Sequence, residues 1–249
     1  MADLDDLKQE VAKACRIIGR LHLTREPNGH VSVRIPDSEL VLVKARGPQE
    51  APLSYTTADD LVVIDMDGNV VEGREGLAKP AEVFIHTEVL RSRPELNSVI
   101  HIHPPNIVAY TIADRPILPI VGAYNPAVLR MVDAGIPVYP RSILINSKER
   151  GADLAEALGG ARVCLMRAHG ITSAGGSVEE ATLNVIHLND LAELQFKADL
   201  LGGAHPIPEE DLRDILDRLP PDVRQPGATR GPSSEWRYYT EAYGQASRF

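Results

Sequence analysis

Two histidines two residues apart carry the strongest chemical signal in this sequence. His101 and His103 lie in the apolar run Ser98–His103, which predicts a strand, and side chains alternate between the two faces of a strand. Both imidazoles therefore point the same way, and two imidazoles on one face are half of a metal site. Glu82, on a helix predicted to precede this strand, adds a carboxylate within the same stretch.

A catalytic zinc-like site needs three or four N, O or S ligands and leaves one position open. His169 is the best further candidate, because it follows the buried strand Val163–Met166 and precedes Gly170, which leaves room for a close approach. His86, one turn after Glu82, fits either a fifth ligand or a residue packed in a helix interface. We expect the two strand ends to converge on one pocket.

Composition narrows the class of protein. The chain has 249 residues and a net charge of −9, which argues against nucleic acid as the main partner but admits an anionic substrate in a local basic pocket. Cys15 and Cys164 are isolated and predict buried free thiols in a reducing compartment. The N-terminus is acidic and amphipathic, and no run approaches the roughly 20 apolar residues of a membrane span. We expect a cytoplasmic protein without membrane contact.

Helical periodicity and strand-like alternation recur along the whole chain. Further helices are predicted at residues 4–22, 106–112, 126–134, 152–158, 178–201 and 209–219, and further strands at 30–35, 40–43, 61–66, 136–139 and 171–174. No repeat or linker separates two cores. One α/β domain with a mixed or mainly antiparallel sheet fits best.

Four motifs together resemble the class II aldolase/adducin family. They are N-G-H-V-S-V-R at 28–34, K-P-A-E-V-F-I-H at 79–86, V-I-H-I-H-P-P at 99–105 and R-A-H-G-I-T at 167–172. Their order and spacing match over roughly residues 5–205. The resemblance implies a single α/β/α domain around a mostly antiparallel mixed sheet, spanning 1–249. It also implies a homotetramer with active sites at subunit interfaces, and we expect the extension 206–249, with Trp236, to pack on a neighbouring subunit.

The resemblance assigns roles to the chemical residues. It implies that His101, His103 and His169 bind one divalent metal ion per subunit and that Glu82 is the catalytic acid/base. Imidazoles around an open position suit Zn²⁺, Mn²⁺, Fe²⁺ or Co²⁺. The family includes sugar-phosphate aldolases, an epimerase and metal-dependent aromatic decarboxylases.

Departures from the sugar-phosphate aldolases point to the substrate. Pro80-Ala81 stand where those aldolases usually have Ser-Ser, Gly29-His30 where they have Gly-Asn, and Lys44–Gly47 where they have a Thr-Gly phosphate loop. Three phosphate-binding elements are thus altered, while the three metal-binding histidines of the family are all present. Arginine binds a planar carboxylate bidentately, so Arg46 suits a carboxylate substrate. His30 and the segment 122–126, G-A-Y-N-P, resemble the decarboxylase branch.

We therefore expect a divalent-metal-dependent lyase that decarboxylates a hydroxylated, dihydroxyphthalate-like aromatic dicarboxylate without oxidation, in aromatic catabolism. Substrate contacts are predicted from His30, Lys44, Arg46, Gly47, Tyr124, Arg141 and His187. Purely structural roles are the alternative for two of these residues. A loop arginine such as Arg46 is usually solvated, and a mid-helix histidine such as His187 most often only packs in the fold. The alternatives are an aldolase or epimerase acting on a small sugar or its phosphate, oxidative chemistry at a non-haem iron, and an adducin-like scaffold without enzymatic activity.

Overall fold

A single mixed sheet of eight strands organises the chain. The computed structural model describes residues 4–219 and 231–246. The strand order is β4-β3-β2-β1-β5-β8-β7-β6, and every neighbouring pair is antiparallel except β6 and β7. The strands are β1 (His30–Arg34), β2 (Leu40–Lys44), β3 (Leu61–Asp65), β4 (Val70–Glu72), β5 (Ser98–Ile102), β6 (Val138–Tyr139), β7 (Val163–Met166) and β8 (Gly170–Gly175).

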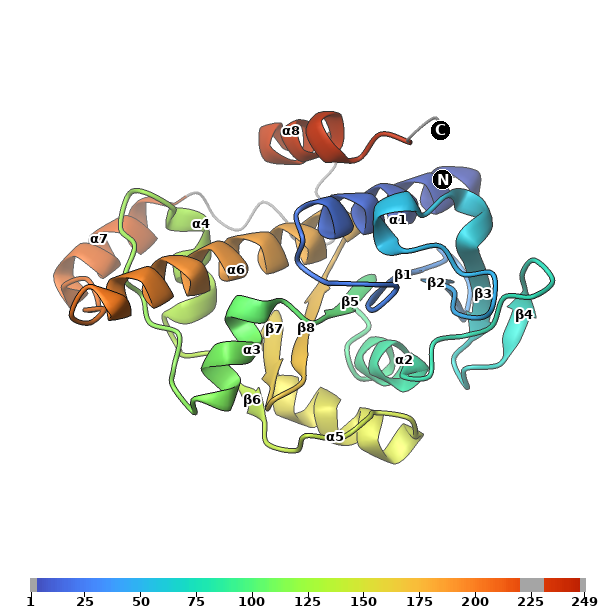
Figure 1. The fold of residues 1–249 in the computed structure, drawn as a ribbon, viewed down its shortest axis with the longest axis horizontal. Coiled ribbons are helices and arrows are strands. Elements are labelled where there is room, and N and C mark those ends of the chain that lie inside the picture. Colours follow the sequence, from blue (N-terminus) through green and yellow to red (C-terminus); the bar gives the residue numbers. More distant parts are fainter. Residues whose placement is uncertain (1–3, 220–230, 247–249) are drawn as a thin grey trace.

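Helices cover both faces of this sheet (Figure 1). α1 and α6 pack on one face, where α3 and α4 join α6, and α2 and α5 pack together on the other. The helices are α1 (Leu4–Arg20), α2 (Val83–Ser92), α3 (Pro105–Ile112), α4 (Pro126–Val132), α5 (Lys148–Leu158), α6 (Val178–Leu200), α7 (Glu209–Arg218) and α8 (Ser234–Tyr243), with short 3₁₀ turns at Leu53–Tyr55 and Ala58–Asp60. The predicted α/β/α architecture around a mostly antiparallel sheet is confirmed.

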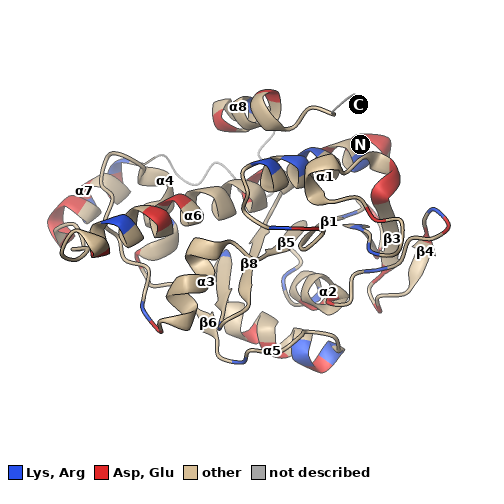
Figure 2. Cartoon of the chain, in the orientation of Figure 1, with Lys and Arg blue, Asp and Glu red and all other residues tan. Residues whose placement is uncertain are grey.

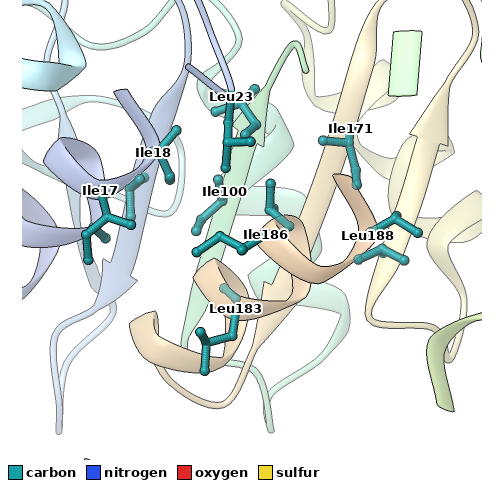
Figure 3. Close-up of a cluster of buried hydrophobic side chains, with 14 of the residues drawn as sticks. Ile17, Ile18, Leu23, Ile100, Ile171, Leu183, Ile186 and Leu188 are labelled. Atoms are coloured by element: carbon teal, nitrogen blue, oxygen red, sulfur yellow. The ribbon is translucent and has the colours of Figure 1, made fainter. Parts of the chain in front are cut away.

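Strand alternation divides the core into two layers. Ile100 and Ile102 of β5 pack with Leu42 of β2 in the cluster under α1 and α6, part of which is drawn in Figure 3. Val99 packs with Val43 in the cluster under α2 and α5. Charged residues lie mainly on the outer helices, and the central strands β5, β7 and β8 carry none (Figure 2). The face on which a strand residue lies therefore decides which helices it meets.

The C-terminal helix α8 packs on α1 of its own chain (Figure 1). Trp236 is buried in the core, and Arg16 and Arg20 donate hydrogen bonds to the carbonyls of Gly244 and Tyr243. This corrects the expectation that Trp236 packs on a neighbouring subunit. A contact between other parts of the tail, such as the exposed Tyr238, and a neighbour stays a prediction.

None of the helices in residues 4–219 and 231–246 is long and apolar enough to cross a membrane.

Candidate metal centre

Four predicted residues meet at one point of the sheet. β5 carries His101 and ends just before His103, and the turn between β7 and β8 carries His169. Because β5 and β8 are neighbours in the sheet, these strand ends lie side by side. Glu82 joins them from the start of α2. One donor atom from each of the four residues lies within 4.8 Å of each of the others.

The spacing of these atoms fits ligands of one cation. Nε2 of His101 and Nε2 of His103 are 3.0 Å apart, and Oε2 of Glu82 lies 3.4 Å from Nε2 of both His101 and His169. Ligands about 2.1 Å from one ion at tetrahedral angles are about 3.4 Å apart. Three imidazoles and a carboxylate are also the donor types that Zn²⁺ and its neighbours prefer. The group therefore fits a divalent metal ion.

His101 and His103 are neutral, and His101 is also oriented for this role. Nδ1 of His101 lies 3.1 Å from the carbonyl oxygen of Ile171, which only accepts, so Nδ1 carries the proton and Nε2 offers its lone pair. Burial lowers the pKa of His101, and burial together with the neighbouring His101 and His169 lowers the pKa of His103 to about 3. Metal ligation requires unprotonated nitrogens, and these two side chains supply them at neutral pH.

Glu82 stands at the N-cap of α2, immediately before the helix, whereas the sequence predicts it on the helix. Its Oε1 accepts a 2.8 Å hydrogen bond from the amide of Ile145, which leaves Oε2 facing the histidines. Burial raises the pKa of this carboxyl, but the neighbouring imidazoles of His101 and His169 and the hydrogen bond from Ile145 outweigh burial and hold the pKa well below its usual range. Glu82 is therefore ionised at neutral pH.

The turn that carries His169 is tightly built. Ala168 has a φ of 50°, an uncommon conformation for a residue with a side chain, and its amide donates to Oγ1 of Thr111. The next residue but one, Gly170, has no space for a side chain: a Cβ there would lie 2.3 Å from the carbonyl oxygen of Ile102. The glycine thus lets β8 approach the strand that carries His101.

Substitution of Gly170 by alanine is expected to separate β8 from β5, because the backbone of Ile102 cannot yield locally. We expect a loss of about 1–3 kcal/mol in the free energy of unfolding and weaker metal binding, measured by denaturant unfolding and metal titration. Gly160→Ala is the matched control, since nothing lies within 4 Å of a Cβ there. Unchanged stability and metal affinity in Gly170→Ala would contradict this account of the turn.

Arg46 lies close enough to the four-donor group for its charge to act on His103, and Gly47 follows it in the chain. Arg46 pairs through its backbone with Ala78, just before the segment that carries Glu82, and its charge contributes to lowering the pKa of His103. The guanidinium is partly engaged: Nη1 donates to the carbonyl of Pro27, and Nε pairs with Glu50 at 2.9 Å. Gly47 has a φ of 131°, which favours glycine at this bend.

Lys44 lies on the opposite side of the sheet, so its predicted substrate contact is corrected. β2 runs through Lys44, which places this side chain on the same face as Leu42, toward α1, whereas His101 lies on the face of Val99. Lys44 is fully buried, and its amine donates to the carbonyl of Ala45 at 2.7 Å.

The remaining predicted contacts are not gathered at this group within one chain. Tyr124 and His187 line a pocket of about 390 Å³ between α4, α6 and α8, and Tyr124 is 79% exposed. Nδ1 of His187 lies 3.2 Å from the side-chain nitrogen Nδ2 of Asn125. Arg141 lines a separate hollow beside α5. None of the four metal-donor residues lines either pocket.

His30 does lie beside the donor group. It is buried, it pairs directly with His101 across β1 and β5, and the two rings are 5.4 Å apart. The sequence left open the position of His86, which contacts His30, and gave no prediction for Ser32, which contacts His86. Their signals were the four-residue spacing from Glu82 to His86 and the two-residue spacing from His30 to Ser32, each of which shares a face.

Comparisons with known proteins agree with this arrangement. Residues 9–196 match the family model of the class II aldolase and adducin N-terminal domain. The chain is 39% identical over 235 residues to the 3,4-dihydroxyphthalate decarboxylase of Arthrobacter keyseri, covering 93% of this chain and 91% of that protein. It is 41% identical over 216 residues to the enzyme of the same name from Terrabacter sp., covering 86% and 90%. An aldolase II superfamily protein from Pseudomonas syringae superposes with a TM-score of 0.81 at 23% identity, covering 97% of this chain and 93% of that one. The chain belongs to the class II aldolase and adducin N-terminal domain family.

Proposed function

We propose that this protein is a metal-dependent decarboxylase of a hydroxylated aromatic dicarboxylate, of the dihydroxyphthalate kind. The observation that carries the proposal is the extended similarity to two proteins with that named activity, at 39% and 41% identity over most of the chain. The altered phosphate-binding elements at Pro80-Ala81 and Gly29-His30 support a substrate without phosphate.

The resident cofactor in this proposal is one divalent cation per subunit, Zn²⁺, Mn²⁺, Fe²⁺ or Co²⁺, held by His101, His103 and His169. When bound, such an ion supplies Lewis-acid stabilisation for the negative charge that develops on the ring as carbon dioxide leaves.

Glu82 moves the proton that the reaction needs. The bond between the ring carbon and the carboxylate breaks, its electron pair stays on the ring carbon, and a proton must then form the new C–H bond. Because Glu82 is ionised, it first takes a proton from the ring hydroxyl next to the departing carboxylate and then returns it to that carbon. The amide of Ile145 holds Oε1, so Oε2 is the oxygen that exchanges the proton.

Arg46 holds the carboxylate that stays on the ring. Its side chain is partly exposed, so the guanidinium is accessible to a ligand. We expect Arg46→Gln to raise KM for a dihydroxyphthalate about ten- to a hundredfold, with a smaller effect on kcat, since a hydrogen bond to a charged group contributes about 1.5–3 kcal/mol. Steady-state kinetics measure this, with the exposed Arg237→Gln on α8 as the control. An unchanged KM would show that Arg46 does not bind the substrate carboxylate.

Gly47, Tyr124, Arg141 and His187 remain proposed substrate contacts. The exposure of Tyr124 and the separation of its pocket from the donor group support a role across a subunit boundary. We therefore propose a homotetramer with active sites at the subunit interfaces.

A parallel assay tests the function. The metal-loaded protein is incubated with dihydroxyphthalate isomers while carbon dioxide is measured, and with ketose phosphates while dihydroxyacetone phosphate is measured. Carbon dioxide from a dihydroxyphthalate is the expected result. Activity only in the second assay would make the protein an aldolase.

A further inference from the structure

A buried chain of hydrogen bonds runs from Ser32 through His86 to His30. Oγ of Ser32 lies 2.6 Å from Nδ1 of His86, and Nε2 of His86 lies 2.9 Å from Nδ1 of His30. Ser32 and His86 are fully inaccessible, and His30 is 5% exposed. The chain ends next to the metal donors, because His30 is the cross-strand partner of His101.

His30 itself lies outside the group of metal donors. The four atoms that meet belong to Glu82, His101, His103 and His169. Nδ1 of His30 is occupied by His86, and among the described residues no group hydrogen-bonds its Nε2. The two ring nitrogens of an imidazole point in different directions, so Nε2 faces away from His86 and is left for another partner.

The direction of these hydrogen bonds follows from the Ser32 end, where the series stops at a backbone carbonyl. The hydroxyl of Ser32 donates to the carbonyl oxygen of Val99 at 3.2 Å, and a carbonyl only accepts. With its hydrogen on that carbonyl, Oγ of Ser32 accepts from Nδ1 of His86. Burial lowers the pKa of His86 to about 3, so this ring is neutral and carries a single proton. With that proton on Nδ1, Nε2 of His86 accepts from Nδ1 of His30, and Nε2 of His30 is unprotonated.

We propose that His30 presents a fixed hydrogen-bond acceptor to the site and uses it to recognise a ring hydroxyl of the substrate. Ser32 and His86 are positioning residues, because they set the tautomer of His30 without touching the substrate. The identity of the ligand rests on the proposed function, whereas the tautomer of His30 does not.

An acceptor at this position selects between substituents. It binds a hydroxyl, which donates, and it repels a carboxylate, whose oxygens are acceptors as well. The hydroxyl next to the departing carboxylate gives its proton to Glu82, so His30 takes the other hydroxyl of a dihydroxyphthalate. An analogue without that hydroxyl leaves a buried acceptor unpaired, which costs binding free energy.

The tautomer is measured directly, without reference to activity. Long-range ¹H–¹⁵N correlation spectra of the zinc-loaded, ¹⁵N-histidine-labelled protein report which nitrogen of each ring carries the proton, and His30→Phe assigns the signals. We expect His30 and His86 to be protonated at Nδ1, and Ser32→Ala to disturb both. A proton on Nε2 of His30 would overturn the proposal.

The recognition is measured with a pair of substrates. The ratio of kcat/KM for 3,4-dihydroxyphthalate to that for 3-hydroxyphthalate is compared between wild type and variants, so that differences in the amount of folded protein cancel. We expect His30→Phe to reduce this ratio at least about tenfold. Ser32→Ala, the mildest change, should reduce it less, and it should leave the metal content unchanged. Ser38→Ala, in the turn between β1 and β2, is the control and should leave the ratio at its wild-type value.

The outcomes separate the two proposals. Decarboxylation with the same ratio in wild type, His30→Phe and Ser32→Ala would overturn the role of His30 and leave the function standing. If wild type decarboxylates neither compound, calorimetric titration of both into the zinc-loaded protein follows. Equal affinities, or no binding of either, would overturn hydroxyl recognition as well.

Discussion

His103→Ala is expected to lose the bound metal ion and to lower the decarboxylation rate by on the order of 10³, because the Lewis-acid stabilisation supplied by a metal is worth several kcal/mol. His103 is the best histidine to replace, since it follows β5 and is only partly buried, whereas His101 is fully inaccessible within the strand. Metal content by elemental analysis and initial rates of carbon dioxide release measure the two effects.

The control is His205→Ala, an exposed histidine outside every helix and strand. It should keep both the metal and the rate. A His103→Ala protein that keeps its metal and its activity would show that the four-donor group is not the catalytic centre, and would revive the scaffold alternative.

Glu82→Gln is expected to lower kcat by about 10²–10⁴, the usual contribution of a general acid or base. The amide oxygen of glutamine can still accept from the amide of Ile145, so the side chain keeps its place but no longer exchanges a proton. The three histidines should retain the metal. Elemental analysis beside the kinetics therefore decides the role of Glu82.

Loss of the metal from Glu82→Gln would show that Glu82 is a metal ligand and not the acid/base. Nearly wild-type kcat with the metal in place would leave the proton transfer to another group.

The residues of the donor group can be predicted from the sequence because each has a local signal. His101 and His103 share a strand face at a two-residue spacing, and His169 follows a strand and precedes a glycine. Their meeting in space depends on β5 and β8 being neighbours, which local patterns do not contain. The family resemblance supplies that information.

Lys44 shows how one residue changes a prediction. Treated as the first residue of a loop, it was free to turn toward the substrate; as the last residue of β2, it must follow the alternation of the strand and points to the other face. The strand continues through Lys44 because its backbone pairs with Leu61 of β3.

Contacts between distant segments were not predictable. Ile145 meets Glu82 across 63 positions of sequence, and His86 meets His30 across 56. A backbone amide has no residue type to search for. Likewise, the sequence of α8 shows an apolar face but does not tell whether that face packs on α1 of the same chain or on α1 of a neighbouring subunit.

The most direct test of the function is an anaerobic measurement on one substrate. The metal-free protein, the metal-reloaded protein and the reloaded protein with excess chelator are each given 3,4-dihydroxyphthalate labelled with ¹³C in both carboxylates. We expect one equivalent of labelled carbon dioxide and a product with one carboxylate fewer, formed only by the reloaded protein. No labelled carbon dioxide under any condition, or release that requires oxygen, would contradict it.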